Sequence, residues 1–219
     1  MQNKSRISDM KQVVICCVMV VFGWSLLLPF RAFGEVSPVE DVLYEEITTE
    51  PIAVGEADRI AKDFLQKTSS GNGTDAVDLY FDADTYLLLA FPDIRRTLSE
   101  MENGQLMQEF VRYIKLVASM PELKGTKHKI ISESITEHGF SKVVYVDLYG
   151  TSLEQEHALI FRKVNGGLKY FDMHREDQSM PIMLREAYLK FSDRQTPRMT
   201  LIEFFKLINK GLERRIQKN

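Results

Sequence analysis

The clearest pattern of hydrophobic and polar positions in the chain is a helical one that begins at Ser99. Apolar residues recur there every three or four positions, which places them on one face of an amphipathic helix. Ser99 and Glu102 are spaced as a capping box at the start of the helix, and Pro121 ends it. The predicted apolar face consists of Leu106, Phe110, Tyr113, Ile114 and Val117.

Shorter helical patterns precede this helix. Residues 55–70 show helical spacing up to a stop that is rich in Ser and Gly. Residues 75–91 predict two short helical segments on either side of Asp82, and Pro92 closes the second one. Residues 35–54 contain two prolines and little periodicity, so they are interpreted as an extended leader with at most one short helix.

The period changes to two between residues 127 and 174, where apolar and polar positions alternate. Four such segments with short connections predict an antiparallel meander. The last connection, residues 165–167, has the composition Asn-Gly-Gly of a tight hairpin turn. The four segments are KHKIISESIT, SKVVYVDLYG, EHALIFRKV and LKYFDMH, and the first three are joined by EHGF and TSLEQ.

Helical spacing returns at residues 179–191, and a last helix begins near Thr200, which fits a second capping box with Glu203. The order of helices, strands and helices predicts one α+β domain over residues 55–219. Its expected architecture is a four-stranded antiparallel curved sheet packed by N- and C-terminal helices, as in the cone-shaped cystatin-like and NTF2-like folds.

Residues 1–34 have the pattern of a secretory signal peptide. Basic residues are followed by an almost unbroken apolar run at 13–30 and by the small residues Ala32 and Gly34 before Glu35. The alternative is an uncleaved anchor, because the run is just long enough to span a bilayer. Cleavage is favoured by Pro29 and by the small residues, so we expect an exported, periplasmic protein.

Removal of residues 1–34 changes the charge and the cysteine content. The remaining chain has 24 Lys and Arg against 30 Asp and Glu, which argues against nucleic acid as a partner. Cys16 and Cys17 both lie in the removed segment, so the mature chain can form no disulfide and no thiolate metal site.

Reactive side chains are densest at the end of the fourth predicted strand. Asp172 and His174 are two positions apart and share one face of that strand. Zinc requires three or four protein ligands, and this pair supplies two. His128, His138 and His157 are isolated in the sequence and are predicted to be half-exposed strand residues rather than ligands.

No HExxH, GxSxG, P-loop or Gly-rich dinucleotide motif occurs in the sequence. We therefore expect neither an enzyme nor a bound metal or cofactor. The predicted strands are apolar on both faces, although a sheet with helices on one side needs only one apolar face. The surplus of apolar residues on the strands indicates one of two arrangements. Either the sheet has a two-sided core or a dimer contact, or part of its surface lines a cavity for an apolar ligand.

Three segments resemble the MlaC-like, or toluene-tolerance, family of periplasmic phospholipid carriers. YFDADTYLLLAF is similar to the Phe-Asp segment of that family, QLMQEFVRYIKLV to its long helix, and LIEFFKLINKGLERR to its closing helix. Asp172 and Met173 stand at the Asp-Val pair of the family, and residues 176–180 stand at its Glu-Gly-Val-Ser-Leu turn. The chain departs from the family at Asp177, where the family has Gly, and near Leu168, where it has Trp.

The resemblance covers roughly residues 56–215 and implies a carrier that shuttles phospholipid between an inner-membrane ABC transporter complex and an outer-membrane lipoprotein complex. The acyl chains would lie in an apolar slot between helices and sheet. The residues expected to line this slot are Phe64, Leu89, Phe110, Tyr113, Ile114, Val146, Leu148, Phe161, Phe171 and Phe204.

The polar cluster is structural in this interpretation. Asp172 would end the strand, Glu176 and Ser179 would bind backbone amides at the following turn and helix start, and Arg185 would pair with one of the acids. The basic residues near the last helix are interpreted as a solvated helix face or as contacts to lipid head groups or a partner. They are Arg185, Arg198, Lys206 and Arg214.

The main alternative is an NTF2-like or cystatin-like small-molecule enzyme or dimeric binding module. Its site would use a pair deep in a pocket, such as Tyr145 with Asp147 or with His174. A structural protein of the cell envelope is a further alternative.

Overall fold

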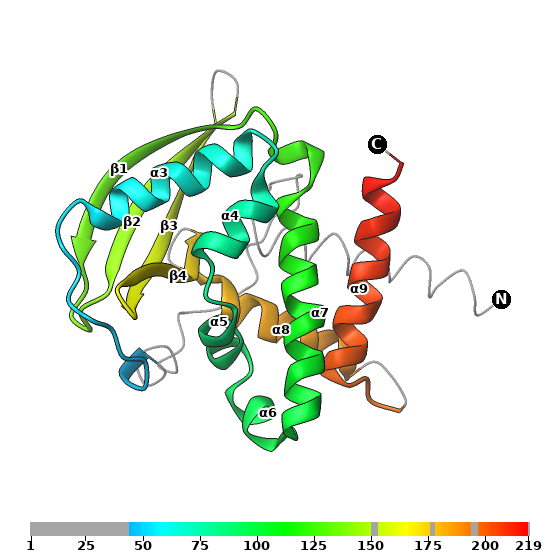
Figure 1. Cartoon of the computed structure of the whole chain (residues 1–219). Coiled ribbons are helices and arrows are strands. Elements are labelled where there is room, and N and C mark those ends of the chain that lie inside the picture. The colour runs from blue at the N-terminus through cyan, green and yellow to red at the C-terminus, as the bar shows by residue number, and fades with distance from the viewer. Residues whose placement is uncertain (1–43, 150–152, 176–177, 194–196, 219) are drawn as a thin grey trace.

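The computed structural model describes residues 44–149, 153–175, 178–193 and 197–218. The predicted signal peptide and the first part of the predicted leader, residues 35–43, lie outside these residues. The chain forms a curved antiparallel sheet with helices along one face and a group of helices beyond its last strands (Figure 1). The helices are α3 (Glu56–Ser69), α4 (Gly73–Tyr80), α5 (Ala83–Ala90), α6 (Pro92–Thr97), α7 (Glu100–Ala118), α8 (Met180–Ser192) and α9 (Leu201–Ile216), with a 3₁₀ turn at Pro121–Leu123.

The sheet contains five strands in the order β1-β2-β3-β4-β5, and every neighbouring pair is antiparallel. The predicted meander of four strands is confirmed, but the predicted number of strands is wrong. The fifth strand has only two residues and pairs with the end of β4, which is too short for any alternation to appear in the sequence. The strands are β1 (Lys127–Ile135), β2 (Ser141–Tyr149), β3 (Leu153–Val164), β4 (Gly167–Arg175) and β5 (Gln178–Ser179).

Local sequence signals set the ends of several elements. The turn between β3 and β4 has positive φ at both Asn165 (51°) and Gly166 (73°), as a two-residue hairpin requires. β3 nevertheless begins at Leu153, so residues 153–155, predicted as loop, belong to the strand. Both predicted capping boxes are present, at the starts of α7 and α9.

The two helical segments predicted around Asp82 are α4 and α5. Asp82 caps α5, because its Oδ1 accepts a hydrogen bond from the backbone N–H of Thr85 at 3.1 Å. Pro92 does not simply close this region. It stands at the first position of α6, where a proline is favoured, and α6 was not predicted.

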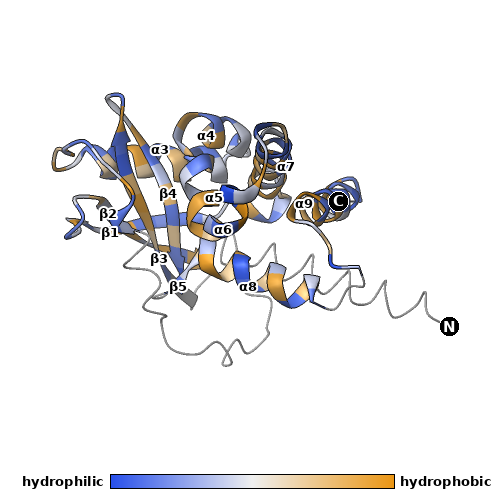
Figure 2. Ribbon diagram, turned by 90° about the horizontal axis from the view of Figure 1, so that it is seen from below, coloured by the Kyte–Doolittle hydropathy of each residue, from blue (hydrophilic) through white to orange (hydrophobic). Residues whose placement is uncertain are grey.

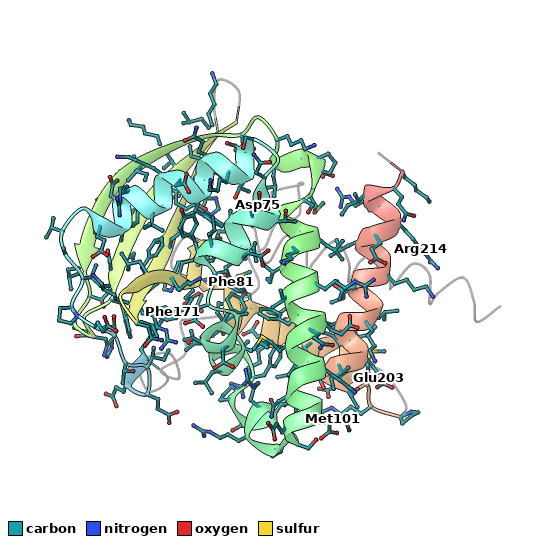
Figure 3. The ribbon with its side chains drawn as sticks, viewed as in Figure 1. Asp75, Phe81, Met101, Phe171, Glu203 and Arg214 are labelled. Atoms are coloured by element: carbon teal, nitrogen blue, oxygen red, sulfur yellow. The ribbon has the colours of Figure 1, made fainter. Side chains whose placement is uncertain are left out.

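The main hydrophobic core lies between the sheet and the helices. Phe81 is at its centre, with ring centroids 5.0 Å from Tyr170 of β4, 5.4 Å from Tyr86 of α5 and 6.0 Å from Phe110 of α7 (Figure 3). α7 and α9 lie side by side on the far side of this core (Figure 1). None of the helices in the described part of the chain is long and apolar enough to span a membrane.

A second, smaller cluster covers the other face of the sheet. It consists of Ile47, Leu89, Phe140, Ile160 and Phe171, with Tyr44 packed against it. The end of the predicted leader therefore packs onto the sheet as part of the fold. Because β3 and β4 are packed on both faces, both faces of these two strands are apolar.

Candidate functional site

The ten residues expected to line a slot lie in two places. Most of them belong to the main core, where they contact one another or shared neighbours, and the rest lie on the opposite face of the sheet. Phe110 and Phe204, for example, both pack against Phe205, with ring centroids 5.4 and 5.5 Å apart. Residues in the main core are Phe64, Phe110, Tyr113, Ile114, Phe161 and Phe204. Residues in the second cluster are Leu89 and Phe171.

Val146 and Leu148 alternate with Tyr145, which faces the main core, so they point to the other side of β2. Val146 is buried there and Leu148 is half-buried. The structure thus brings six of the ten residues together between helices and sheet, and places four of them away from that space.

A hollow of about 390 Å³ lies at the junction of α6, α8 and the start of α9. This volume falls within the range of small-molecule sites in proteins. α8 carries both hydrophobic and hydrophilic residues along its length (Figure 2). The hollow is lined by Phe91, Pro92, Asp93, Ile94, Arg185, Tyr188, Leu189, Arg198, Met199 and Thr200.

The floor of this hollow, hereafter the α6–α8–α9 hollow, is aromatic and rigid. The rings of Phe91 and Tyr188 meet edge to face with centroids 5.6 Å apart. The Tyr188 hydroxyl donates a hydrogen bond to the backbone oxygen of Met199 at 3.0 Å, which ties the segment before α9 to α8. Burial raises the pKa of Tyr188, so this hydroxyl stays protonated and remains a donor.

The rim of the hollow carries two guanidinium groups. Arg185 lies 3.5 Å from Asp93, and Arg198 lies 3.0 Å from Asp193. The Asp93 side chain is 80% exposed and that of Asp193 is 64% exposed, so both ion pairs lie in water, where such pairs contribute little free energy. Among the described residues Arg185 pairs with Asp93 of α6; the predicted pairing with an acid of the 172–177 cluster is not tested at Glu176 and Asp177, which lie outside those residues.

A wider and shallower groove of about 560 Å³ runs along the outer face of α7 beside α4. Met107, Val111 and Leu116 give it an apolar floor. Its basic residues are paired: Arg112 with Glu213 of α9, and Lys115 with Asp78 of α4 at 2.6 Å.

A buried polar cluster on the helix-facing side of the sheet contains Tyr145 and Asp147, the pair named for the alternative enzyme, together with two histidines that were not predicted to join them. His128 Nδ1 lies 2.6 Å from one oxygen of Asp147, and His157 Nε2 lies 3.4 Å from the other. Burial by itself raises the pKa of Asp147, but the hydrogen bond from His128 and the nearby His157 imidazole outweigh it and lower that pKa to about 2. The ring of Tyr145 stacks on His157 with centroids 5.2 Å apart. The prediction that His157 is half-exposed is wrong, since its exposure is 1%.

The cavity beside this Asp147 cluster has a volume of about 20 Å³, which is room for a single water molecule. Sequence spacing could not show that His128 and His157 join Asp147, because the three residues come from three strands. The pairing register was the missing signal: it sets His128 opposite Asp147 and His157 opposite Tyr145. Across the described ranges, no three His, Cys, Asp or Glu residues are grouped so that they could hold a metal ion.

Asp172 and His174 share a face of β4, as predicted, with His174 Nε2 lying 3.0 Å from Asp172 Oδ2. The same oxygen accepts a hydrogen bond from the Tyr44 hydroxyl. Asp172 does not end the strand, because β4 continues to Arg175 and Asp172 is fully buried within it. Ser179 precedes α8 but makes no side-chain hydrogen bond that caps it, so that prediction is also wrong, and Glu176 and Asp177 lie outside the described residues.

No protein-family model and no curated protein matches the sequence. A solved structure does match: the phospholipid-binding protein from Ralstonia solanacearum, determined in complex with a phospholipid. The TM-score is 0.54 at 11% sequence identity, and the match covers 72% of this chain and 96% of the other. The chain therefore shares the fold of that protein.

Proposed function

We propose that this protein binds phospholipid and carries it across the periplasm. The observation that carries the proposal is the α6–α8–α9 hollow, whose apolar floor opens to solvent beneath two arginines. A phospholipid has the same two-part chemistry, an apolar chain joined to an anionic phosphate. The shared fold with a phospholipid-binding protein supports the proposal.

The energetics of lipid transfer explain why a carrier needs apolar surface more than a catalytic group. Each methylene buried from water contributes about 0.8 kcal/mol. Moving an acyl chain of about fifteen methylenes from a membrane into water therefore costs about 12 kcal/mol. A protein that replaces part of that burial lowers the barrier to transfer. The head group can stay at the solvent-exposed rim.

In this proposal the chain is exported through a cleaved signal peptide and acts in the periplasm. It would receive and deliver phospholipid at an inner-membrane ABC transporter complex and an outer-membrane lipoprotein complex. It would not act as an enzyme. We infer that the Asp147 cluster is structural, because a cavity of about 20 Å³ has no room for an organic substrate.

The direct test is to purify the mature protein from cells, extract it with organic solvent and identify phospholipid by mass spectrometry. We expect close to one lipid per protein. Protein that emerges free of lipid, and that takes up none from vesicles of phosphatidylethanolamine and phosphatidylglycerol, would contradict the proposal.

Two matched variants identify which of the two hollows holds the acyl chain of the lipid. Met199 lines the α6–α8–α9 hollow and Met107 lines the α7 groove, and both are half-buried and packed against the same core. We expect Met199→Gln to lower the lipid content of the purified protein and Met107→Gln to leave it unchanged. The reverse result would move the site to α7.

A further inference from the structure

The two arginines on the rim of the α6–α8–α9 hollow lie above the same apolar floor. We propose that Arg185 and Arg198 together bind the phosphate of an amphiphile whose chain lies on Ile94, Leu189 and Met199, an inference that rests on the proposed lipid-binding function. The ligand is a phosphate ester with a long alkyl or acyl chain. Guanidinium groups suit it because their planar donors match phosphate oxygens two at a time.

The positions of the two guanidinium groups are set by different elements. Arg185 stands on α8 three and four residues before Tyr188 and Leu189, so all three lie on one face of the helix and Arg185 is held beside the apolar floor. Arg198 belongs to the segment before α9, and the hydrogen bond from Tyr188 to the neighbouring Met199 fixes that segment. The floor residue Tyr188 thus connects both halves of the proposed phosphate site.

The acids near these arginines do not block a phosphate. The Arg185–Asp93 distance of 3.5 Å exceeds the roughly 2.7–2.9 Å of a strong charge-assisted hydrogen bond. Asp93 and Asp193 are both largely exposed, so they can turn into water when a ligand arrives. Arg198 also donates to the hydroxyl of Ser192 through Nε at 3.4 Å, while its Nη2 lies 3.0 Å from the exposed Asp193.

Other basic residues near the last helix serve as controls. Lys206 and Arg214 do not line the hollow, and Arg214 lies toward the opposite end of α9 from Glu203 in the first turn (Figure 3). In the α7 groove, Arg112 and Lys115 are each paired with an acid of a neighbouring helix. The α6–α8–α9 hollow therefore combines an apolar floor with two arginines whose ion-pair partners are largely exposed.

The test compares two detergents with the same chain, dodecyl phosphate and dodecyl maltoside, by calorimetric titration of lipid-free protein below their micelle concentrations. We expect the wild type to bind dodecyl phosphate more tightly. Arg185→Gln and Arg198→Gln should each weaken dodecyl phosphate binding about tenfold or more and leave dodecyl maltoside binding unchanged. Lys206→Gln and Arg214→Gln should change the affinity for dodecyl phosphate by less than about twofold.

Each outcome of this experiment decides the assignment. If the arginine variants weaken the binding of both detergents equally, or of neither, the phosphate site is refuted. Binding of the alkyl chain in the hollow is then still supported. If inorganic phosphate alone binds as tightly as dodecyl phosphate, the site recognises a free anion and the amphiphile is refuted. If wild-type protein binds neither detergent, the proposed lipid-binding function fails together with the site. Unchanged melting temperatures of the four variants establish that they are folded.

Discussion

At the scale of single residues, Asp147 is the most unusual group in the described structure. It is a buried carboxylate between two histidines, and its pKa is lowered to about 2. A lowered pKa means that folding favours the ionised form, so this interaction stabilises the fold at neutral pH. The stabilisation is fully present above the unfolded-state pKa near 4 and is lost as pH falls toward 2.

We expect Asp147→Asn to lower the free energy of unfolding at pH 7 by about 2–3 kcal/mol, from a pKa shift of roughly two units. Urea unfolding of wild type and variant between pH 7 and pH 2.5 measures the difference. It should stay constant down to about pH 4.5 and shrink below that. A difference that does not change with pH would show that the charge of Asp147 is not what stabilises the fold.

Tyr44 shows how a single side chain joins the leader to the sheet. Its hydroxyl donates to the buried Asp172, and its ring packs against Phe140 and Phe171 with centroids 5.9 Å away in each case. Tyr44→Phe should cost about 1–3 kcal/mol in unfolding free energy through the lost hydrogen bond to a buried carboxylate. Tyr44→Ala should cost roughly 3–5 kcal/mol, since the ring contacts are lost as well. Equal stability of all three proteins would mean that the leader is not part of the folded unit.

At the scale of elements, the contact between α4 and α7 depends on one glycine. A Cβ atom at Gly73 would lie 2.1 Å from the backbone oxygen of Ala118. The start of α4 and the end of α7 therefore approach each other more closely than any other residue type allows.

Gly73→Ala should lower the free energy of unfolding by about 3 kcal/mol, because the two helices must move apart. Gly104, inside α7, is the matched control, because a Cβ there would meet nothing within 4 Å. Gly104→Ala should raise the stability by about 0.5–1 kcal/mol through helix propensity. Chemical unfolding of both variants measures the two effects. If both substitutions changed the free energy of unfolding in the same direction, the packing argument would be refuted.

How well each element could be predicted depends on how local its signals are. The capping boxes at Ser99 and Thr200 and the Asn165-Gly166 turn act within four residues, and all three are confirmed. β5 is fixed only by backbone pairing with the end of β4, so it left no pattern to find. The sequence does not reveal α6, because a proline such as Pro92 is typical both of the end of a helix and of its first turn.

At the scale of the whole molecule, the helices beyond the sheet create the α6–α8–α9 hollow. Ligand binding there should raise the melting temperature, because a ligand that binds only the folded state stabilises it. Dodecyl phosphate at about 100 times its Kd should add about 2.7 kcal/mol and raise the Tm by roughly 5–10 °C. In the Arg185→Gln, Arg198→Gln double variant the same concentration should give a much smaller rise. Scanning calorimetry measures both, and an equal rise in the two proteins would contradict a role for the arginines.

The sequence by itself determined the longer helices, the alternating strands and their antiparallel order, because these follow from hydrophobic period, caps and turns that act over a few residues. Tertiary structure alone decided which side chains meet. His128, Asp147 and His157 come together through strand register, and Arg185 meets Asp93 across 92 positions of the chain. The tertiary structure also divided the ten expected slot residues between the two faces of the sheet. The alternation of residues along a strand shows which residues share a face, but it does not show what covers each face.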